Sequence, residues 1–251
     1  MQLERTGAAA LLRMNAGKAN AINPAFLDRM NALLDELEAA PPRALVLTGQ
    51  GRAFCAGLDL PTLIDLDRAQ LTAFIRRFSE LMLRIFMLPW PVVAAVNGHA
   101  VAGGCVLALQ ADQRLMAGGE GVIGLNEVRL GIGLPSVVVE TLRCQVPPGS
   151  LFSIAAEGGL LPPAEAHRLG LVQEVVEPGR LLERAAERAS ALAEIPARAF
   201  ASVKRSLRGP VLDTIRAAEG EDAAAWVGTF HGPEGQALLR EVVARLTKKP
   251  A

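Results

Sequence analysis

The stretch "PVVAAVNGHAVAGGCVLALQAD", Pro91 to Asp112, contains the pattern that decides the fold. It opens with Val92–Val96, an uninterrupted apolar run of the length of a buried strand. Turn residues follow at Asn97 and Gly98, and a glycine pair then opens an apolar segment of helical character. A buried strand, a glycine turn and a helix in this order are typical of α/β proteins.

The same alternation extends in both directions along the chain. Towards the N-terminus, the sequence predicts two short strands around Gly7, a helix over 23–40, a strand over 44–49 and a helix over 67–87. Towards the C-terminus, it predicts strands at 114–117, 121–125 and 171–176, with helices at 135–143, 149–157 and 163–168. Helices interrupted near Pro196, Gly209 and Gly232 then extend almost to the end. We therefore expect an α/β core over 1–195 and a helical region over 196–251.

Composition excludes several classes of function. Lys and Arg total 26, and Asp and Glu also total 26, so no charge excess favours nucleic acid or a membrane surface as a partner. No apolar run is long enough to span a bilayer. The three cysteines and three histidines lack the spacing of a metal site, so we expect no metal. Because Met1–Thr6 lacks the layout of a signal peptide, and scattered cysteines suit a reducing compartment, we expect a cytoplasmic protein.

Two glycine-rich corners follow buried strands, "FCAGLDL" over 54–60 and "AVAGGCV" over 100–106. Glycine leaves backbone N–H groups unshielded, and two such groups aimed at one point would stabilise an oxygen that gains negative charge. The corners could instead be packing turns or a phosphate-binding site. Neither corner matches GxxxxGK[ST], and no GxGxxG follows a strand, so a nucleotide cofactor is not indicated.

Four motifs carry a resemblance that covers nearly the whole chain: "GRAFCAGLDL", "PVVAAVNGHAVAGGCVLAL", "IGLNEVRLGI" and "LLPPAEAHRLGLVQEVV". In order and spacing they resemble the crotonase, or enoyl-CoA hydratase/isomerase, superfamily, and most of all its mitochondrial-type Δ3,Δ2-enoyl-CoA isomerases. The resemblance implies the crotonase fold, a spiral of ββα units with a C-terminal helical region that serves trimerisation and forms part of the acyl pocket. It also implies a homotrimer or dimer of trimers acting on an acyl-CoA, with the CoA thioester as substrate and no separate cofactor.

The resemblance also implies roles for individual residues. The N–H groups of Leu58 and Gly103 would form an oxyanion hole, and Glu127 of "IGLNE" would be the catalytic acid and base. Residues implied to bind the substrate are Ala56, Asp59, Leu60, Asn126 and Trp226. Of these, Asp59 and Leu60 would lie along CoA, Asn126 would orient the carboxylate or contact the thioester, and Trp226 would border the acyl pocket.

Val106 distinguishes between the activities of the superfamily. Hydratases that resemble this chain carry a first glutamate at this position and a second one further along, because one activates water while the other handles the C2 proton. Here the first position is Val106 and the second is Glu127. One carboxylate suffices to move a double bond from C3 to C2, as in fatty acid β-oxidation. Apolar neighbours should raise the pKa of Glu127, which would favour return of the proton.

Other interpretations stay open at this point. Glu127 could be a strand-end carboxylate paired with Arg129, while Glu120 would be solvated and Asp112 structural. Glu140 is a candidate second acid. His99 would be a packed loop residue, and Cys55 and Cys105 small buried residues. Lys204 and Arg205 would belong to a solvated helix face or contact CoA phosphates.

Alternative functions are a hydratase, a dienoyl-CoA isomerase, a decarboxylase of the same superfamily, and a non-catalytic acyl-CoA-binding scaffold. A nucleic-acid-binding hydratase, found in one branch of the superfamily, lacks support in this neutral chain. The isomerase is distinguished from the other enzymes by its single carboxylate, and from the scaffold by the retained Glu127.

Overall fold

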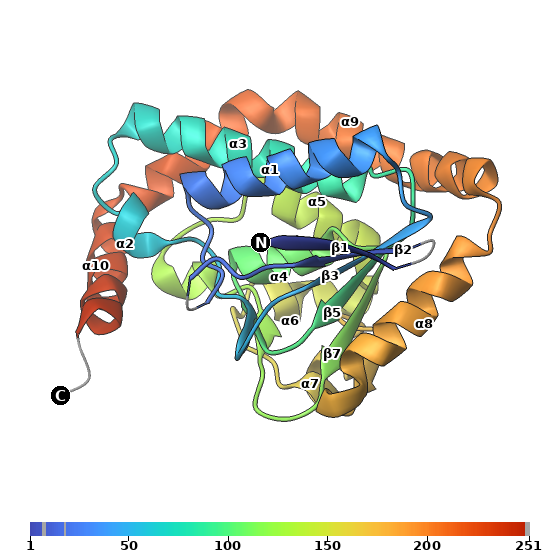
Figure 1. The fold of residues 1–251 in the computed structure, drawn as a ribbon. Helices are drawn as coiled ribbons and strands as arrows, with labels where there is room; N and C mark the ends of the chain where they lie inside the picture. The colour runs from blue at the N-terminus through green and yellow to red at the C-terminus, as the bar shows by residue number, and fades with distance from the viewer. Residues whose placement is uncertain (7–8, 18, 249–251) are drawn as a thin grey trace.

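A six-stranded sheet forms one layer of the fold in the computed structural model, which describes residues 1–6, 9–17 and 19–248 (Figure 1). Its strand order is β1-β2-β3-β5-β7-β9. β1 pairs antiparallel with β2, and every later pair is parallel. The strands are β1 Gln2–Thr6, β2 Ala9–Arg13, β3 Ala44–Thr48, β5 Val92–Val96, β7 Gln113–Ala117 and β9 Glu174–Val176. The predicted turn at Gly7 and the last residues, from Lys249, lie outside the described part of the chain.

A second, smaller sheet contains β4 (Ala53–Cys55), β6 (His99–Val101) and β8 (Ile123–Gly124), all parallel. The chain alternates between the two sheets: β3 leads to β4, β5 to β6 and β7 to β8. Each such pair of strands is followed by helical structure. This repetition is the predicted spiral of ββα units.

The helices begin where local sequence signals place them. The Asn23 side chain accepts from Phe26 N at the start of α1 (Pro24–Ala39), with Pro24 in the first turn. Asp67 and Gln70 form a reciprocal capping box at the start of α3 (Arg68–Phe86). The remaining helices of the core are α2 Leu60–Leu63, α4 Gly103–Leu109, α5 Ser136–Gln145, α6 Leu151–Ala155, α7 Pro163–Arg168 and α8 Leu181–Ala193, with 3-10 turns at Glu127–Leu130, Pro148–Ser150 and Pro178–Arg180.

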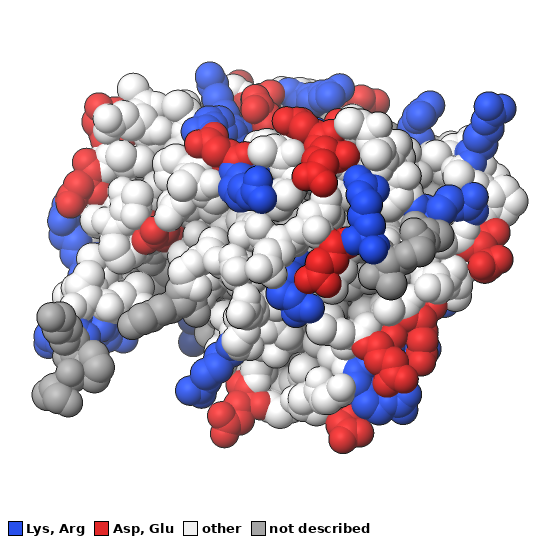
Figure 2. Space-filling model, viewed as in Figure 1, with Lys and Arg blue, Asp and Glu red and all other residues white. Residues whose placement is uncertain are grey.

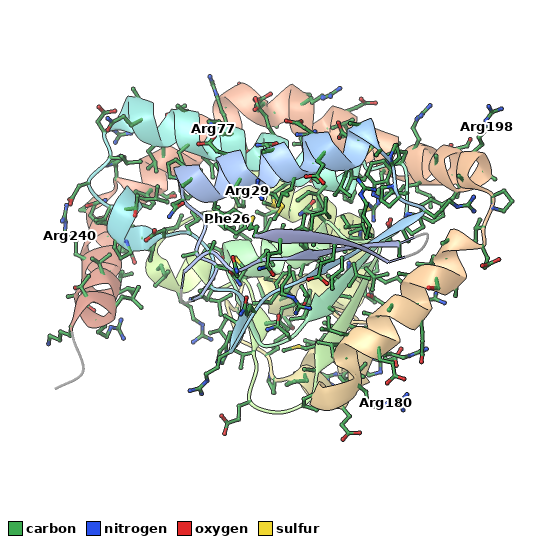
Figure 3. All side chains as sticks on the ribbon, in the orientation of Figure 1. Phe26, Arg29, Arg77, Arg180, Arg198 and Arg240 are labelled. Atoms are coloured by element: carbon green, nitrogen blue, oxygen red, sulfur yellow. The ribbon has the colours of Figure 1, made fainter. Side chains whose placement is uncertain are left out.

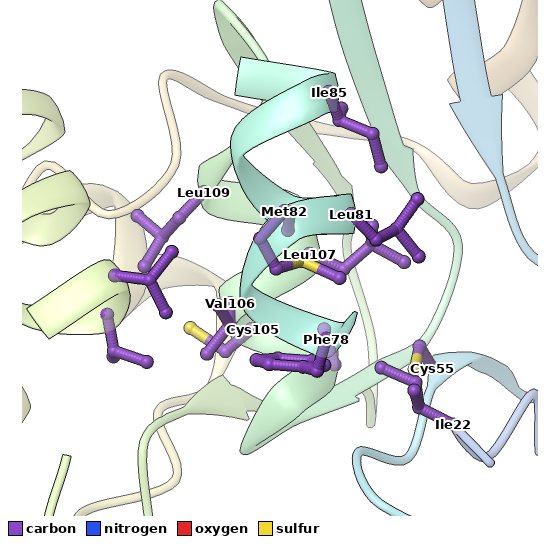
Figure 4. Close-up of a cluster of buried hydrophobic side chains, with 14 of the residues drawn as sticks. Ile22, Cys55, Phe78, Leu81, Met82, Ile85, Cys105, Val106, Leu107 and Leu109 are labelled. Atoms are coloured by element: carbon purple, nitrogen blue, oxygen red, sulfur yellow. The ribbon is translucent and has the colours of Figure 1, made fainter. Parts of the chain in front are cut away.

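Two apolar clusters cover the two faces of the large sheet. α8 packs against one face, where its alanines meet outward-facing residues of β3, β5 and β7 such as Val46, Val93 and Leu115. The other face belongs to the main core, which includes α1, α3 and α4. Figure 4 shows part of this core, with Phe78 and Met82 of α3 drawn beside Cys105 and Val106 of α4. α4 is buried along its whole length, so the helix that opens at the glycine pair is fixed in place.

The C-terminal helices fold back over the core. α9 (Ala197–Phe230) contacts α3 and α5, and α10 (Pro233–Thr247) contacts α2. The predicted breaks at Pro196 and Gly232 are confirmed, but the predicted break at Gly209 is wrong, because α9 continues through Gly209 and Pro210. An interior proline costs a helical hydrogen bond. Here tertiary contacts on both sides compensate, since Arg208 and Ile215 are both buried.

A buried ion-pair cluster joins α9 to the sheet. Asp112 accepts from Val92 N and Lys204 Nζ, at 2.7 and 2.8 Å, and its other oxygen lies 2.9 Å from Arg208 Nη2. Lys204 and Arg208 are each only 5% exposed. The prediction that Lys204 lies on a solvated face or contacts CoA is therefore wrong, whereas Arg205 beside it is exposed. The structural role expected for Asp112 is confirmed.

The molecular surface carries charges of both signs. On the face shown in Figure 2, basic and acidic side chains are interspersed over α1 and α3. Within the described residues, every helix is too short or too polar to cross a lipid bilayer.

Candidate functional site

The carboxyl ends of the three short strands define the candidate site. β4 leads into Ala56–Leu60, β6 into Gly103, and β8 into Asn126 and Glu127. Because the three strands are parallel neighbours, their carboxyl ends meet at one edge of the small sheet. Ligand sites of parallel sheets form at such edges. Residues 70 positions apart in the chain, such as Glu127 and Gly57, are thus brought to one place.

The first corner leaves the N–H of Leu58 free for a ligand. Ile22 N donates to Gly57 O at 2.8 Å, and Asp59 N donates to Ile22 O at 2.9 Å. This parallel bridge uses the residues on both sides of Leu58, so the Leu58 N–H faces away from Ile22. Among the described residues, no backbone oxygen accepts from it.

The second corner is the start of α4. Gly103 occupies its first position, where N–H groups have no partner within the helix. Ala102 before it has φ +50°, a conformation that costs alanine free energy. It is held there by two hydrogen bonds, from Ala102 N to Gly124 O at 2.8 Å and from Val106 N to Ala102 O at 3.0 Å. Such strain is common where a backbone group must be aimed at a ligand.

The two corners touch, and only glycine allows it. A Cβ on Gly57, whose φ is +87°, would lie 2.7 Å from Val101 O and 3.2 Å from Gly103 N. A Cβ on Gly104 would lie 1.9 Å from Cys55 O. The backbones of the two corners are therefore in direct van der Waals contact. This contact brings Leu58 and Gly103 together, and both line one cavity.

That cavity has a volume of about 500 Å³ and is mostly apolar. All eight predicted site residues line it: Ala56, Leu58, Asp59, Leu60, Gly103, Asn126, Glu127 and Trp226. Val106 of α4 lines it too, as do Ile75 and Phe78 of α3. Concave apolar cavities with a few convergent polar groups are the usual form of small-molecule sites.

Glu127 is a partly buried acid that lines this cavity. Its Oε2 atom is buried and has no hydrogen-bond partner among the described residues. Burial raises the pKa of the Glu127 carboxyl from its ordinary value of 4.5 to about 7. Its neighbours Val106, Ile123 and Leu125 are almost fully buried and apolar, as the sequence predicted. A carboxyl in such surroundings exchanges a proton readily near neutral pH.

Asn126 presents a second unpartnered polar atom to the cavity. Its Oδ1 atom is buried and, within the described chain, accepts no hydrogen bond. Buried polar atoms without partners are rare in folded proteins. The two adjacent unpartnered groups of Asn126 and Glu127 are therefore available to a bound molecule.

The other candidate acids considered from the sequence lie outside the cavity. Glu140 pairs with Arg143 at 2.9 Å on α5 and does not line the cavity, so its suggested role as second acid is wrong. Glu120 is exposed and near Arg52. Arg129 donates to Glu157 O at 2.8 Å, and no ion pair joins it to Glu127 in the described structure.

Comparison with known proteins identifies the family. The enoyl-CoA hydratase/isomerase family model matches residues 4–236. The chain belongs to the enoyl-CoA hydratase/isomerase family. It is 36% identical over 189 residues to a putative enoyl-CoA hydratase of Thermus thermophilus, covering 74% of each chain. It is 28% identical over 243 residues to the human mitochondrial enoyl-CoA delta isomerase 1, covering 96% of this chain and 80% of the relative.

The crystal structure of human mitochondrial delta3-delta2-enoyl-CoA isomerase matches with a TM-score of 0.94 at 28% identity, covering 98% of this chain and 97% of that one. The relatives of this chain thus carry both hydratase and isomerase names. The protein is an enzyme of the hydratase/isomerase family, and the choice between the two reactions depends on the residues in its own cavity.

The sequence-based predictions did not name all the residues that line the candidate active-site cavity. His99 lies on β6 and lines the cavity, where a packed loop residue was expected. Val242 and Leu246 of α10 line it as well; they lie in the C-terminal region expected to form part of the acyl pocket, but neither residue was predicted by name. The amphipathic pattern after Gly232 was a signal for a packed helix, but periodicity alone does not say which surface that helix covers.

Proposed function

We propose that this protein is a Δ3,Δ2-enoyl-CoA isomerase that acts in fatty acid β-oxidation and moves the double bond of a 3-enoyl-CoA from C3 to C2. The observation that carries the proposal is that Glu127 is the only carboxylate besides Asp59 among the described residues lining the cavity, while α4 presents Val106 to the same space. Asp59 accepts from Asn23 and Thr62 at 3.0 and 2.9 Å and so has a local role at the cavity mouth. A single free acid suits proton transfer within the substrate better than addition of water.

In the proposed reaction, Glu127 removes a proton from C2 and the C2–H electron pair forms a dienolate whose charge extends to the thioester oxygen. The same carboxyl, now protonated, returns the proton at C4, and the conjugated 2-enoyl thioester results. A Glu127 pKa of about 7 supports both half-reactions, because removal needs the anion and return needs the acid. No metal and no separate cofactor takes part in these steps.

The Leu58 and Gly103 N–H groups would stabilise the dienolate oxygen. Each preorganised donor of an oxyanion hole contributes about 3–4 kcal/mol of barrier lowering. The strained Ala102 and the glycine contacts of Gly57 and Gly104 fix these donors before substrate arrives. Asn126 precedes the base in the sequence and lines the same cavity, and its side-chain amide would orient the carboxylate or contact the thioester.

The cavity also suggests which way the acyl-CoA lies. At one end it shares Ala19, Ala21 and Asp59 with a neighbouring hollow that contains polar Asn23 and Arg29. Arg29, labelled in Figure 3, extends from α1. At the other end the lining is apolar, with Phe78, Val138 and Trp226. We place the CoA group towards Arg29 and the acyl chain towards Trp226.

A coupled assay tests the proposal. The protein should convert 3-hexenoyl-CoA to the conjugated 2-enoyl-CoA, and Glu127→Gln should lose at least about three orders of magnitude in kcat, as expected for a missing general base. Glu140→Gln, which changes a carboxylate outside the cavity, should leave turnover unchanged. Wild-type turnover by Glu127→Gln would refute the mechanism.

The alternatives give different outcomes in the same experiments. A hydratase would hydrate crotonyl-CoA at least as fast as it isomerises 3-hexenoyl-CoA. A scaffold would bind both CoA esters saturably with no turnover. Val106→Glu should introduce measurable hydration of crotonyl-CoA, because it places a second carboxylate on α4 facing the cavity.

We also propose that the protein is a homotrimer or a dimer of trimers and that it resides in the cytoplasm. The apolar side chains of Val203 and Leu207 are exposed on α9, the helix expected to take part in trimerisation. All three cysteines are free thiols, which suits a reducing compartment.

A further inference from the structure

A second cavity lies behind the apolar end of the candidate active site. It has a volume of about 480 Å³ and is formed by α3, the start of α5 and α9. Two residues line both cavities, Ile75 of α3 and Pro135 at the start of α5. These two residues are therefore the wall between them.

The second cavity suits an apolar guest. Its floor is apolar and consists of Ile75, Leu83, Met87, Pro135, Leu212, Ile215 and Ala223. Its exposed rim has two cations, Arg76 and Arg216, and two anions, Glu80 and Glu219, so neither sign of ligand charge is favoured. The remaining charged groups are engaged, since Arg84 pairs with Asp35 and Glu38.

The two halves of the wall differ in how firmly they are held. Ser136 N and Oγ both donate to Asp222 Oδ2 of α9 at 2.7 Å, next to Pro135. Gly133 N donates to Thr229 Oγ1 at 3.1 Å, so α9 anchors this loop at a second point. Ile75, by contrast, contributes a single aliphatic side chain, 2% exposed, that packs without hydrogen bonds. The side chain of Ile75 is the part of the wall that a substitution can remove.

We propose that Ile75 is a specificity-determining residue: it ends the acyl pocket and restricts the enzyme to shorter acyl chains, and the cavity behind it would take the distal end of a longer chain. This inference rests on the proposed function, because it assumes that the acyl chain points towards Trp226. Its physical basis is that one missing or extra group in an apolar pocket changes discrimination by about 10–200-fold.

The experiment compares 3-hexenoyl-CoA with 3-hexadecenoyl-CoA. The native protein should prefer the shorter substrate, and Ile75→Ala should raise the ratio of kcat/KM for the longer substrate to kcat/KM for the shorter one by about tenfold or more. Leu83→Ala is the matched control, since it truncates a side chain of α3 that lines only the second cavity. Equal preference in the native protein, or an unchanged ratio in Ile75→Ala, would overturn the proposal.

Binding measurements separate this proposal from the proposed function. Calorimetric titration with the saturated hexanoyl-CoA and palmitoyl-CoA needs no turnover, and Ile75→Ala should tighten palmitoyl-CoA binding relative to hexanoyl-CoA. If that shift occurs in a protein that turns over no 3-enoyl-CoA, the isomerase fails and Ile75 still ends the acyl pocket. Should Ile75→Ala not fold, Ile75→Val must shift the same ratio in the same direction, and no shift counts against the proposal.

Discussion

A single carboxyl group determines the pH range in which this cavity can work. Because burial raises the pKa of Glu127 to about 7, the base is mostly protonated in mildly acid solution. We expect kcat/KM for 3-hexenoyl-CoA to fall about tenfold per pH unit below that value. A pH–rate profile of the native protein measures this, and a flat profile down to about pH 5 would exclude Glu127 as the base.

The Glu127 carboxyl also affects the free energy of unfolding. The unfolded chain ionises Glu127 near 4.5 and the folded chain near 7, so between these values the unfolded state loses its proton first and stability falls as pH rises. Glu127→Gln should therefore increase the free energy of unfolding by about 3 kcal/mol at around pH 8, with a smaller difference at around pH 4. Denaturant titrations at the two pH values test this. Glu140→Gln, which removes one partner of a surface ion pair outside the cavity, is the control and should change the free energy of unfolding by less than about 1 kcal/mol.

At the level of secondary-structure elements, the approach of α4 to β4 is the contact on which the oxyanion corners depend. Gly104→Ala would place a methyl group 1.9 Å from Cys55 O, so one of the two backbones must move. We expect a loss of stability of about 3 kcal/mol and loss of isomerase activity in the fraction that folds. Gly149→Ala, with nothing within 4 Å of the added group, is the control for thermal unfolding and turnover. A fully active, stable Gly104→Ala would show that the corners need not touch.

The attachment of α9 is a second element-level feature. Asp112→Ala would leave Lys204 and Arg208 buried without a carboxylate, and breaking such a pair costs about 3–5 kcal/mol. Thermal denaturation should show this loss. Asp65→Ala, which breaks an exposed pair with Arg240, should cost less than about 1 kcal/mol. Similar effects of the two substitutions would mean that the Asp112 cluster contributes little.

The elements also show what the sequence could and could not predict. Long apolar runs such as Val92–Val96 and capped helices such as α1 were predictable because their signals are local. β4 has only three residues, too few for a periodic signal, and the sequence did not predict its pairing with β6, or that of β6 with β8, in a second sheet. Lys204 was misplaced because its partner Asp112 is 92 residues away.

For the candidate site, sequence reasoning assembled the glycine corners and Glu127 through motif resemblance, and the structure brings those residues to one cavity. The walls from α10 and the position of His99 depend on how distant helices and strands pack. A single sequence carries no signal for that packing. The roles of the individual residues stay predictions for the experiments above.

For the whole molecule, the proposed assembly makes a direct prediction. Light scattering after size-exclusion chromatography should give three or six times the chain mass of 26.5 kDa. Leu207 is 68% exposed, and large exposed apolar side chains often mark interfaces. A Val203→Asp/Leu207→Asp double variant should shift the mass towards a single chain, with Ser206→Asp as the control for added charge on α9. A native protein of monomer mass would refute the trimer.

The second sheet is small, and its size affects the order in which activity and secondary structure are lost during unfolding. β4, β6 and β8 together contain few backbone pairs of their own, and the segments that follow them contact Ile22, α5 and α10 from distant parts of the chain. Local opening of such a layer requires less free energy than unfolding of the large sheet. In increasing denaturant, turnover should disappear before the circular dichroism of the helices changes. A native circular dichroism spectrum would then not show that the enzyme is active. Substrate turnover would be the more sensitive measure of correct folding at the site.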